Sequence, residues 1–181
     1  MVCGFHCRVD SPGGIRLPSV WGRRSVVSGA PVGAGTVMLK DLRVLIVDDD
    51  PAILDTLGDY IHSLGHHVTG RRSAQEALDA LRDDAFSLLI TDAQMDGMDG
   101  LELARRVRAN YPGIAILVMT AHENEYPMSA ALRAGADGYV SKPFSLRKFT
   151  IIFERSYWEA LSRLDWWQAR GGDAQVVETV S

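Results

Sequence analysis

The sequence has almost no cysteine and no long hydrophobic run. Cys3 and Cys7 are the only cysteines among 181 residues, too few for a disulfide framework, so we expect a reducing, cytoplasmic location. No second pair of ligands with suitable spacing accompanies them, which argues against a zinc site. No apolar stretch approaches the ~18 residues that cross a membrane. The net charge of −4 is too small to indicate general nucleic-acid binding, and we expect no direct contact with DNA.

The composition changes along the chain. Residues 1–37 are rich in glycine, serine and proline and keep no hydrophobic period, so we expect a disordered or extended leader there. Residues 38–164 have the regular hydrophobic patterning of a folded domain. Residues 165–181 are interpreted as a C-terminal tail.

Five hydrophobic segments are predicted to be strands, and each is followed by a segment with helical spacing. The predicted strands cover residues 43–47, 67–71, 86–91, 114–119 and 138–141. The helical segments begin near residues 51, 73, 99, 126 and 145, and the last of them persists to about residue 164. Five β–α repeats predict an α/β fold in which a parallel sheet has helices on both faces.

Several polar residues have ordinary structural interpretations. Asp50 and Ser73 are expected to cap the first two helices. Three arginines of the third helical segment are expected to face solvent: Arg105, Arg106 and Arg108. Three histidines beside the second strand are expected to lie on the surface: His62, His66 and His67.

The strands end in polar residues that share a chemistry. Asp48 and Asp49 follow the first strand, Asp92 follows the third, and Thr120 and Lys142 end the fourth and fifth. Because parallel strands end at one edge of the sheet, we expect these side chains to meet there. Carboxylates crowded on a shallow rim need a cation and suit Mg²⁺. Asp92 beside the metal becomes a nucleophile toward phosphorus, while Lys142 and the Thr120 hydroxyl neutralise phosphoryl oxygens.

Residues 42 to about 164 resemble the receiver domain of bacterial two-component response regulators. The matching motifs occur in the order typical of the family: Val47-Asp48-Asp49, Asp92 with Met98-Asp99-Gly100, Thr120-Ala121, and Ala134-Gly135-Ala136 through Gly138-Tyr139 to Lys142-Pro143-Phe144. The resemblance implies a flavodoxin-like (βα)5 fold, a three-layer sandwich whose five-stranded sheet has the order 2-1-3-4-5.

The resemblance also implies a phosphorylation site. Asp92 is then the phosphoacceptor for a sensor histidine kinase or a histidine phosphotransfer protein. Mg²⁺ is bound by Asp49, Asp92 and the backbone carbonyl of Gln94, with Asp48 acting mostly through water. The domain is not expected to be an enzyme, because it catalyses only its own phosphorylation and a slow autodephosphorylation.

Further residues take supporting roles by the same resemblance. Lys142 contacts the phosphoryl group, and the bond between Lys142 and the following proline is expected to be cis. Thr120 and Tyr139 are expected to switch position on phosphorylation, although a static, half-buried ring is the alternative for Tyr139. Gln94 and His122 flank the path of the hydrolytic water, and we expect them to tune the lifetime of the phosphoryl group.

The last helical segment indicates a second contact surface. Hydrophobic side chains surround it, including Trp158, Trp166 and Trp167, whereas packing on one core needs only one apolar stripe. We expect a homodimer or a protein partner to bind through residues 145–167 and the face formed by the fourth and fifth β–α units. Packing against the leader or tail of the chain is the alternative.

Two other functions are considered. The chain is alternatively the receiver fragment of a longer response regulator, for example a transcription factor whose output domain is absent. A more remote alternative is a haloacid-dehalogenase-type phosphatase, since Asp48-Asp49-Asp50 contains the Asp-x-Asp pattern of that family.

Overall fold

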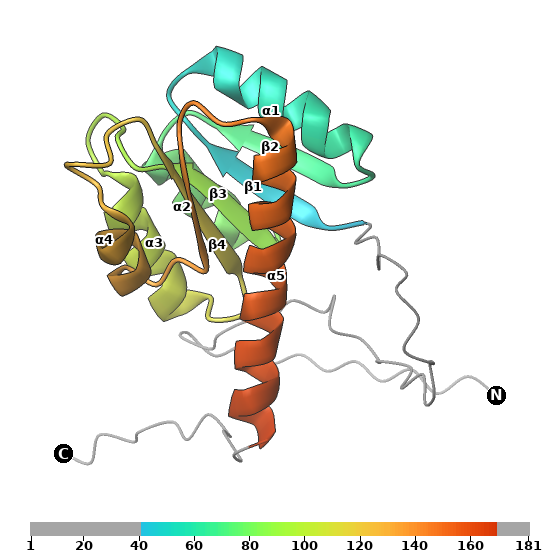
Figure 1. The fold of residues 1–181 in the computed structure, drawn as a ribbon. Helices are drawn as coiled ribbons and strands as arrows, with labels where there is room; N and C mark the ends of the chain where they lie inside the picture. The colour runs from blue at the N-terminus through green and yellow to red at the C-terminus, as the bar shows by residue number, and fades with distance from the viewer. Residues whose placement is uncertain (1–40, 170–181) are drawn as a thin grey trace. The chain divides into compact units, whose positions relative to one another are not determined.

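A computed structural model describes residues 41–169, with side chains described as far as Arg163. The predicted leader and residues 170–181 lie outside the described residues. Strands and helices alternate along the chain in this order: β1 (Arg43–Val47), α1 (Pro51–Ser63), β2 (His67–Arg71), α2 (Ala74–Asp83), β3 (Leu88–Asp92), α3 (Gly100–Asn110), β4 (Ala115–Thr120), α4 (Met128–Arg133), β5 (Gly138–Ser141) and α5 (Leu146–Ala169) (Figure 1). The strands match the predicted segments to within two residues.

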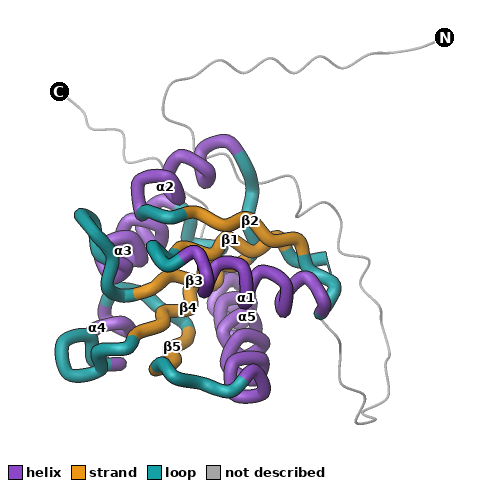
Figure 2. The backbone as a smooth tube through the Cα atoms, turned by 90° about the horizontal axis from the view of Figure 1, so that it is seen from above, coloured by secondary structure: helices purple, strands orange, loops and turns teal. Residues whose placement is uncertain are grey.

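The strands form one parallel sheet in the order β2-β1-β3-β4-β5. This order is the one that the family resemblance implied, and the flavodoxin-like α/β fold is confirmed. Helices α1 and α5 cover one face of the sheet, and α2, α3 and α4 cover the other (Figure 2). The predicted three-layer arrangement is therefore present in residues 41–169.

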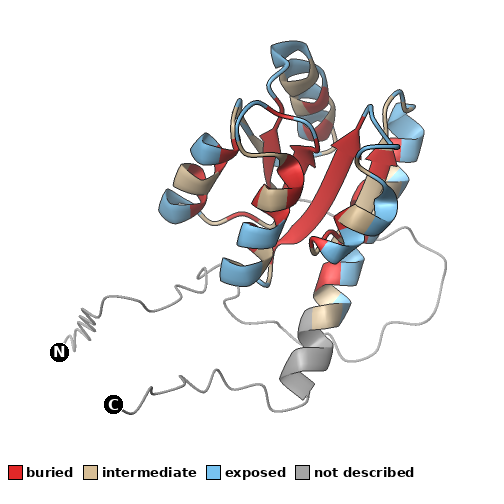
Figure 3. Cartoon of the chain, turned by 90° about the vertical axis from the view of Figure 1, so that its left-hand side faces the viewer, coloured by how far each residue is buried: buried red, intermediate tan, exposed pale blue. Residues whose placement is uncertain are grey.

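Alternate residues of each central strand enter two separate hydrophobic cores. Leu45 and Leu89 pack with α2, α3 and α4, whereas Val44 and Leu88 pack with α1 and α5. Strands β1, β3 and β4 are consequently buried on both faces (Figure 3). This double burial explains why their sequences are continuous apolar runs without alternation.

The helices begin where side chains satisfy the free backbone amides. The Asp50 carboxylate accepts a hydrogen bond from Ala52 N at 2.9 Å, and Ser73 Oγ accepts one from Glu76 N at 3.2 Å. Both predicted caps are confirmed. Gly65 follows α1 with a φ of +90°, a conformation that glycine adopts without steric cost.

The last two helices differ from their predicted extents. Helix α4 begins at Met128, not near Tyr126, because the residue before a proline is disfavoured in helical conformation and Pro127 is the N-cap. Helix α5 continues to Ala169, five residues beyond the predicted end. No glycine or proline interrupts the chain between Leu146 and Ala169. Within the described residues, no helix has both the length and the apolar character that a membrane span requires.

Candidate functional site

The segments that follow the carboxyl ends of β1, β3, β4 and β5 contribute to one open pocket. Its lining includes Asp48, Asp49, Asp92, Gln94, His122 and Lys142. These residues are separated by up to 94 positions in sequence and meet because parallel strands end at a common edge. The predicted site residues are therefore brought together, except that Thr120 and Tyr139 lie outside this lining.

The Lys142 ammonium bridges the two buried carboxylates of the pocket. Its Nζ lies 2.8 Å from Asp48 Oδ2 and 2.6 Å from Asp92 Oδ1. The remaining oxygens accept backbone N–H groups, Asp48 Oδ1 from Asp50 at 3.0 Å and Asp92 Oδ2 from Gln94 at 2.7 Å. The exposed fraction of the side chain is 2% for Asp48, 9% for Asp92 and 19% for Lys142. Each oxygen of the two carboxylates thus accepts one hydrogen bond. The two neighbouring negative charges are balanced here by the Lys142 ammonium.

Burial and charge oppose one another within this group. Burial raises the pKa of Asp48, and the hydrogen bonds from Lys142 and Asp50 N only partly offset that rise. Burial alone would lower the pKa of Lys142, but its bonds to Asp48 and Asp92 outweigh this effect and raise the pKa overall. Lys142 therefore remains a cation across the physiological pH range.

Position 142 is fixed by the backbone as well. The Lys142 N–H donates to Thr120 O at 2.6 Å, which joins the ends of β4 and β5. The peptide bond between Lys142 and Pro143 is cis, as predicted.

The two predicted switch residues, Thr120 and Tyr139, contact the loop between β4 and α4. The buried Thr120 Oγ1 accepts a hydrogen bond from His122 N at 2.9 Å. The half-buried Tyr139 hydroxyl donates to Tyr126 O at 2.8 Å. Both side chains therefore hold the same loop, which borders the pocket through His122 and Tyr126. A change of rotamer at Tyr139 stays a prediction.

The oxygen groups of the pocket fit Mg²⁺. Among the described residues, no three histidine, cysteine or acidic side chains are grouped so that they alone could hold a metal ion. Mg²⁺ does not need such a cage, since it keeps several waters and uses one or two carboxylates. The exposed Asp49, the Asp92 carboxylate and the Gln94 backbone lie around the same pocket. This donor set has the right chemistry for the ion.

Two surface predictions are wrong. His66 is buried, with its ring 5.4 Å from that of Phe153 and its Nδ1 without a partner among the described residues. Arg108 folds back from α3 onto Gly135 O and Asp137, and its side chain is only 20% exposed. A Cβ at Gly135 would lie 2.8 Å from Arg108 Cγ, so the glycine makes room for the arginine. Arg105 and Arg106 are exposed, as predicted.

Comparison with known proteins gives a consistent result. A family model, the response regulator receiver domain, matches residues 44–154. The response regulator protein FleR of Pseudomonas aeruginosa is 41% identical over 113 residues, which are 62% of this chain and 24% of FleR. The chain spans 24% to 57% of the length of the first curated relatives that it matches.

Solved receiver structures share the fold. The response regulator TrrA of Thermotoga maritima, solved in complex with Mg²⁺-BeF, is 29% identical with a TM-score of 0.59, covering 65% of this chain and 99% of that one. The beryllofluoride-activated NtrC4 receiver domain dimer is 26% identical with a TM-score of 0.61, covering 65% and 98% of the two chains. Sequence, fold and pocket agree, and the chain belongs to the receiver domain family of two-component response regulators.

Proposed function

We propose that Asp92 accepts a phosphoryl group from the phosphohistidine of a sensor histidine kinase or a histidine phosphotransfer protein. A carboxylate oxygen of Asp92 forms the new P–O bond, the P–N bond breaks, and the imidazole leaves with the electron pair. The observation that carries the proposal is the Lys142 ammonium, 2.6 Å from Asp92 Oδ1 in a pocket that opens to solvent.

The pocket supplies mainly position and charge, which is what phosphoryl transfer requires. Lys142 lies where it neutralises charge on a phosphoryl oxygen attached to Asp92. The Thr120 hydroxyl, at the end of the neighbouring strand, is the proposed donor to another oxygen. Asp49, Asp92 and the Gln94 carbonyl would hold Mg²⁺, with Asp48 acting through water, and the ion would supply further positive charge there. The domain catalyses only its own phosphorylation and slow dephosphorylation and is not an enzyme with turnover.

The signal is proposed to leave through the face formed by α4, β5 and α5. Met128 and Leu132 are exposed on α4, and Ile151 and Trp158 are exposed on α5. Both helices pack against β5, and large exposed apolar side chains are typical of contact surfaces. They support binding of a protein partner or a second copy, and the NtrC4 relative was solved as a receiver dimer. The side chains of residues 164–167 lie outside the described part.

A receiver fragment of a longer regulator is the second candidate, supported by the greater length of the curated relatives. The phosphatase alternative has less support. Its nucleophile would be Asp48, whose side chain is 2% exposed, against 9% for Asp92, so Asp48 is the less accessible of the two carboxylates.

Phosphorylation with acetyl phosphate and Mg²⁺ tests the proposal. Intact-mass spectrometry of the wild type should show one added phosphate that is stable in acid and lost in base. Asp92→Asn should take up none, whereas Asp96→Asn, on the rim of the same pocket, should be labelled like the wild type. Equal labelling of Asp92→Asn would refute the proposal.

A further inference from the structure

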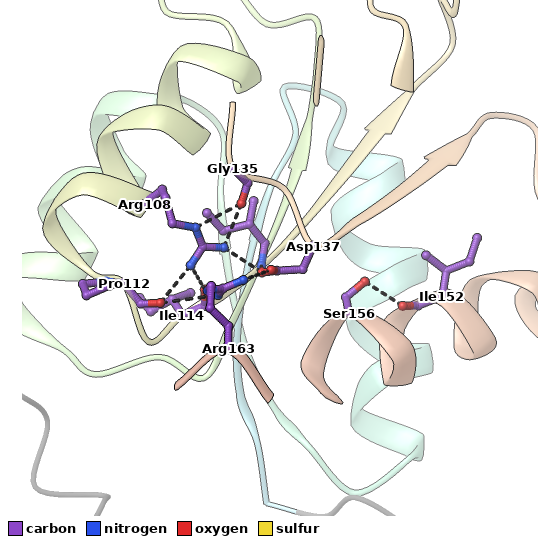
Figure 4. Close-up of polar contacts among 9 residues, drawn as sticks. Arg108, Pro112, Ile114, Gly135, Asp137, Ile152, Ser156 and Arg163 are labelled. Carbon is purple, nitrogen blue, oxygen red and sulfur yellow. Dashed lines mark hydrogen bonds and ion pairs between the residues drawn. The ribbon is translucent and has the colours of Figure 1, made fainter. Parts of the chain in front are cut away.

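A second polar network lies at the end of the sheet opposite the pocket. Asp137 immediately precedes β5, and its carboxylate is 4% exposed. Asp137 Oδ2 accepts from Ile116 N at 2.9 Å and from Arg108 Nη2 at 2.7 Å. Asp137 Oδ1 accepts from Arg163 Nη1 of α5 (Figure 4). One buried carboxylate therefore joins α3, β4, β5 and α5.

Arg108 makes most of the polar contacts at this place. Its guanidinium also donates to Gly135 O at 2.8 Å, Pro112 O at 2.9 Å and Ile114 O at 3.0 Å. It neutralises Asp137 and fixes the loops that lead into β4 and β5. Arg108 bonds to Oδ2 of Asp137, which leaves Oδ1 for a second cation.

Arg163 is that second cation, and it belongs to the late part of α5. Its side chain is 38% exposed, against 20% for Arg108. Besides Asp137, it reaches only Pro112 O, at 3.4 Å, among the described residues. Two guanidinium groups on one carboxylate repel each other. Because Arg163 is the more exposed and has fewer other partners, its bond to Asp137 is the more easily exchanged of the two.

Helix α5 also touches the start of β5 two turns earlier. A Cβ at Gly138 would lie 1.9 Å from Ser156 Oγ, and that hydroxyl is turned onto Ile152 O at 2.7 Å. Ser156 and Arg163 are seven residues apart and lie on one face of the helix. Asp137 and Gly138, at the start of β5, therefore contact α5 at two points, and α5 then continues to Ala169.

Strand β5 connects this network to the pocket. It has only four residues, with Asp137 directly before it and Lys142 directly after it. Lys142 bonds to Asp92 at one end, and Asp137 bonds to Arg163 at the other. One short, hydrogen-bonded strand therefore separates the pocket from the second network.

We propose that the Asp137–Arg163 ion pair sets the direction of the last turns of α5 and couples them to the charge on Asp92 through Lys142 and β5. The coupling rests on the proposed phosphorylation of Asp92. The anchoring of α5 by Arg163 does not, and the two parts are tested separately.

Hydrogen exchange measured by mass spectrometry tests both parts, using the wild type, Arg163→Gln and Arg155→Gln. The control, Arg155, is an exposed arginine of α5 whose contact with Glu159 is 3.9 Å long. Without phosphorylation, Arg163→Gln should speed exchange in residues 160–169 about two- to fivefold, since one partly exposed ion pair is lost. Arg155→Gln should exchange like the wild type.

With acetyl phosphate and Mg²⁺, exchange in residues 160–169 should change in the wild type and in Arg155→Gln, but not in Arg163→Gln. All three proteins should carry equal phosphate. Unchanged exchange in unphosphorylated Arg163→Gln would overturn the anchor. A phosphorylated wild type with unchanged exchange, or a full response in Arg163→Gln, would overturn the coupling. Absence of phosphate on wild-type Asp92 would overturn the proposed function and the coupling with it. The comparison of unphosphorylated wild type with unphosphorylated Arg163→Gln would still test whether Arg163 anchors α5.

Discussion

Replacement of Lys142 by methionine isolates the charge at the centre of the pocket. The side chain keeps a similar length, but Asp48 and Asp92 lose the ammonium that lies 2.8 and 2.6 Å from them. A hydrogen bond to a charged group contributes about 1.5–3 kcal/mol, and removing one partner of a buried pair costs about 3–5 kcal/mol. The carboxylates keep their bonds to Asp50 N and Gln94 N, and protonation relieves part of the repulsion. We expect the free energy of unfolding to fall by about 2 kcal/mol at pH 7.

The loss should depend on pH in a defined direction. Burial already raises the pKa of Asp48, and Lys142→Met removes a hydrogen bond that lowers it. A carboxyl group whose pKa is higher in the folded than in the unfolded state destabilises the fold at high pH. This cost begins as the pH rises above the pKa of the unfolded state, about 3.9 for aspartate, and is absent below it. The difference from the wild type should therefore be largest at pH 7 and smaller near pH 5. Mg²⁺ should restore part of it by supplying a cation.

Urea unfolding at both pH values, with and without Mg²⁺, measures these differences. Lys148→Met is the matched control, because it makes the same change at an exposed lysine of α5 and should leave stability within about 0.5 kcal/mol of the wild type. A Lys142→Met protein as stable as Lys148→Met at pH 7, or equally destabilised at both pH values, would refute the reasoning about the pocket charges.

Three further predictions follow from single residues. Burial lowers the pKa of His66, so wild-type stability should fall as the pH drops below about 6.5. Thermal melts of His66→Leu should lack that part of the pH dependence, and a pH profile equal to that of the wild type would contradict the prediction. Gly138→Ala places a methyl 1.9 Å from Ser156 Oγ and should cost about 1–3 kcal/mol, which Ser156→Ala should partly restore in denaturant titrations of the double variant. Gln94→Ala and His122→Ala should alter the dephosphorylation rate of the labelled protein, and rates equal to the wild type would remove their assigned role.

The central strands and the pocket could be predicted because each depends on a local pattern. Runs such as Val44 to Val47 are apolar throughout, since both faces are buried, and the acids that follow must meet at the sheet edge. The cis bond before Pro143 was predicted from the family resemblance, and the structure contains it.

The opposite end of the sheet could not be predicted in the same way. Helical spacing assigns Arg108 to a face of α3, but it does not reveal that a long side chain bends toward carbonyls up to 27 residues away. His66 lies between α1 and β2, where no periodicity applies, and its burial results from the ring of Phe153 on α5. Contacts of this kind depend on tertiary packing, and local sequence carries no signal for them.

The attachment point of the phosphoryl group is the most direct test of the proposed role of Asp92. The protein is labelled with acetyl phosphate and Mg²⁺ and reduced with borohydride, which converts an aspartyl phosphate to homoserine. Tandem mass spectrometry of the peptides that contain positions 48, 49 and 92 then locates the change. We predict homoserine at position 92 alone, and none there without acetyl phosphate. Homoserine at position 48 or 49 with position 92 unchanged would contradict the assignment of Asp92 as the phosphoacceptor.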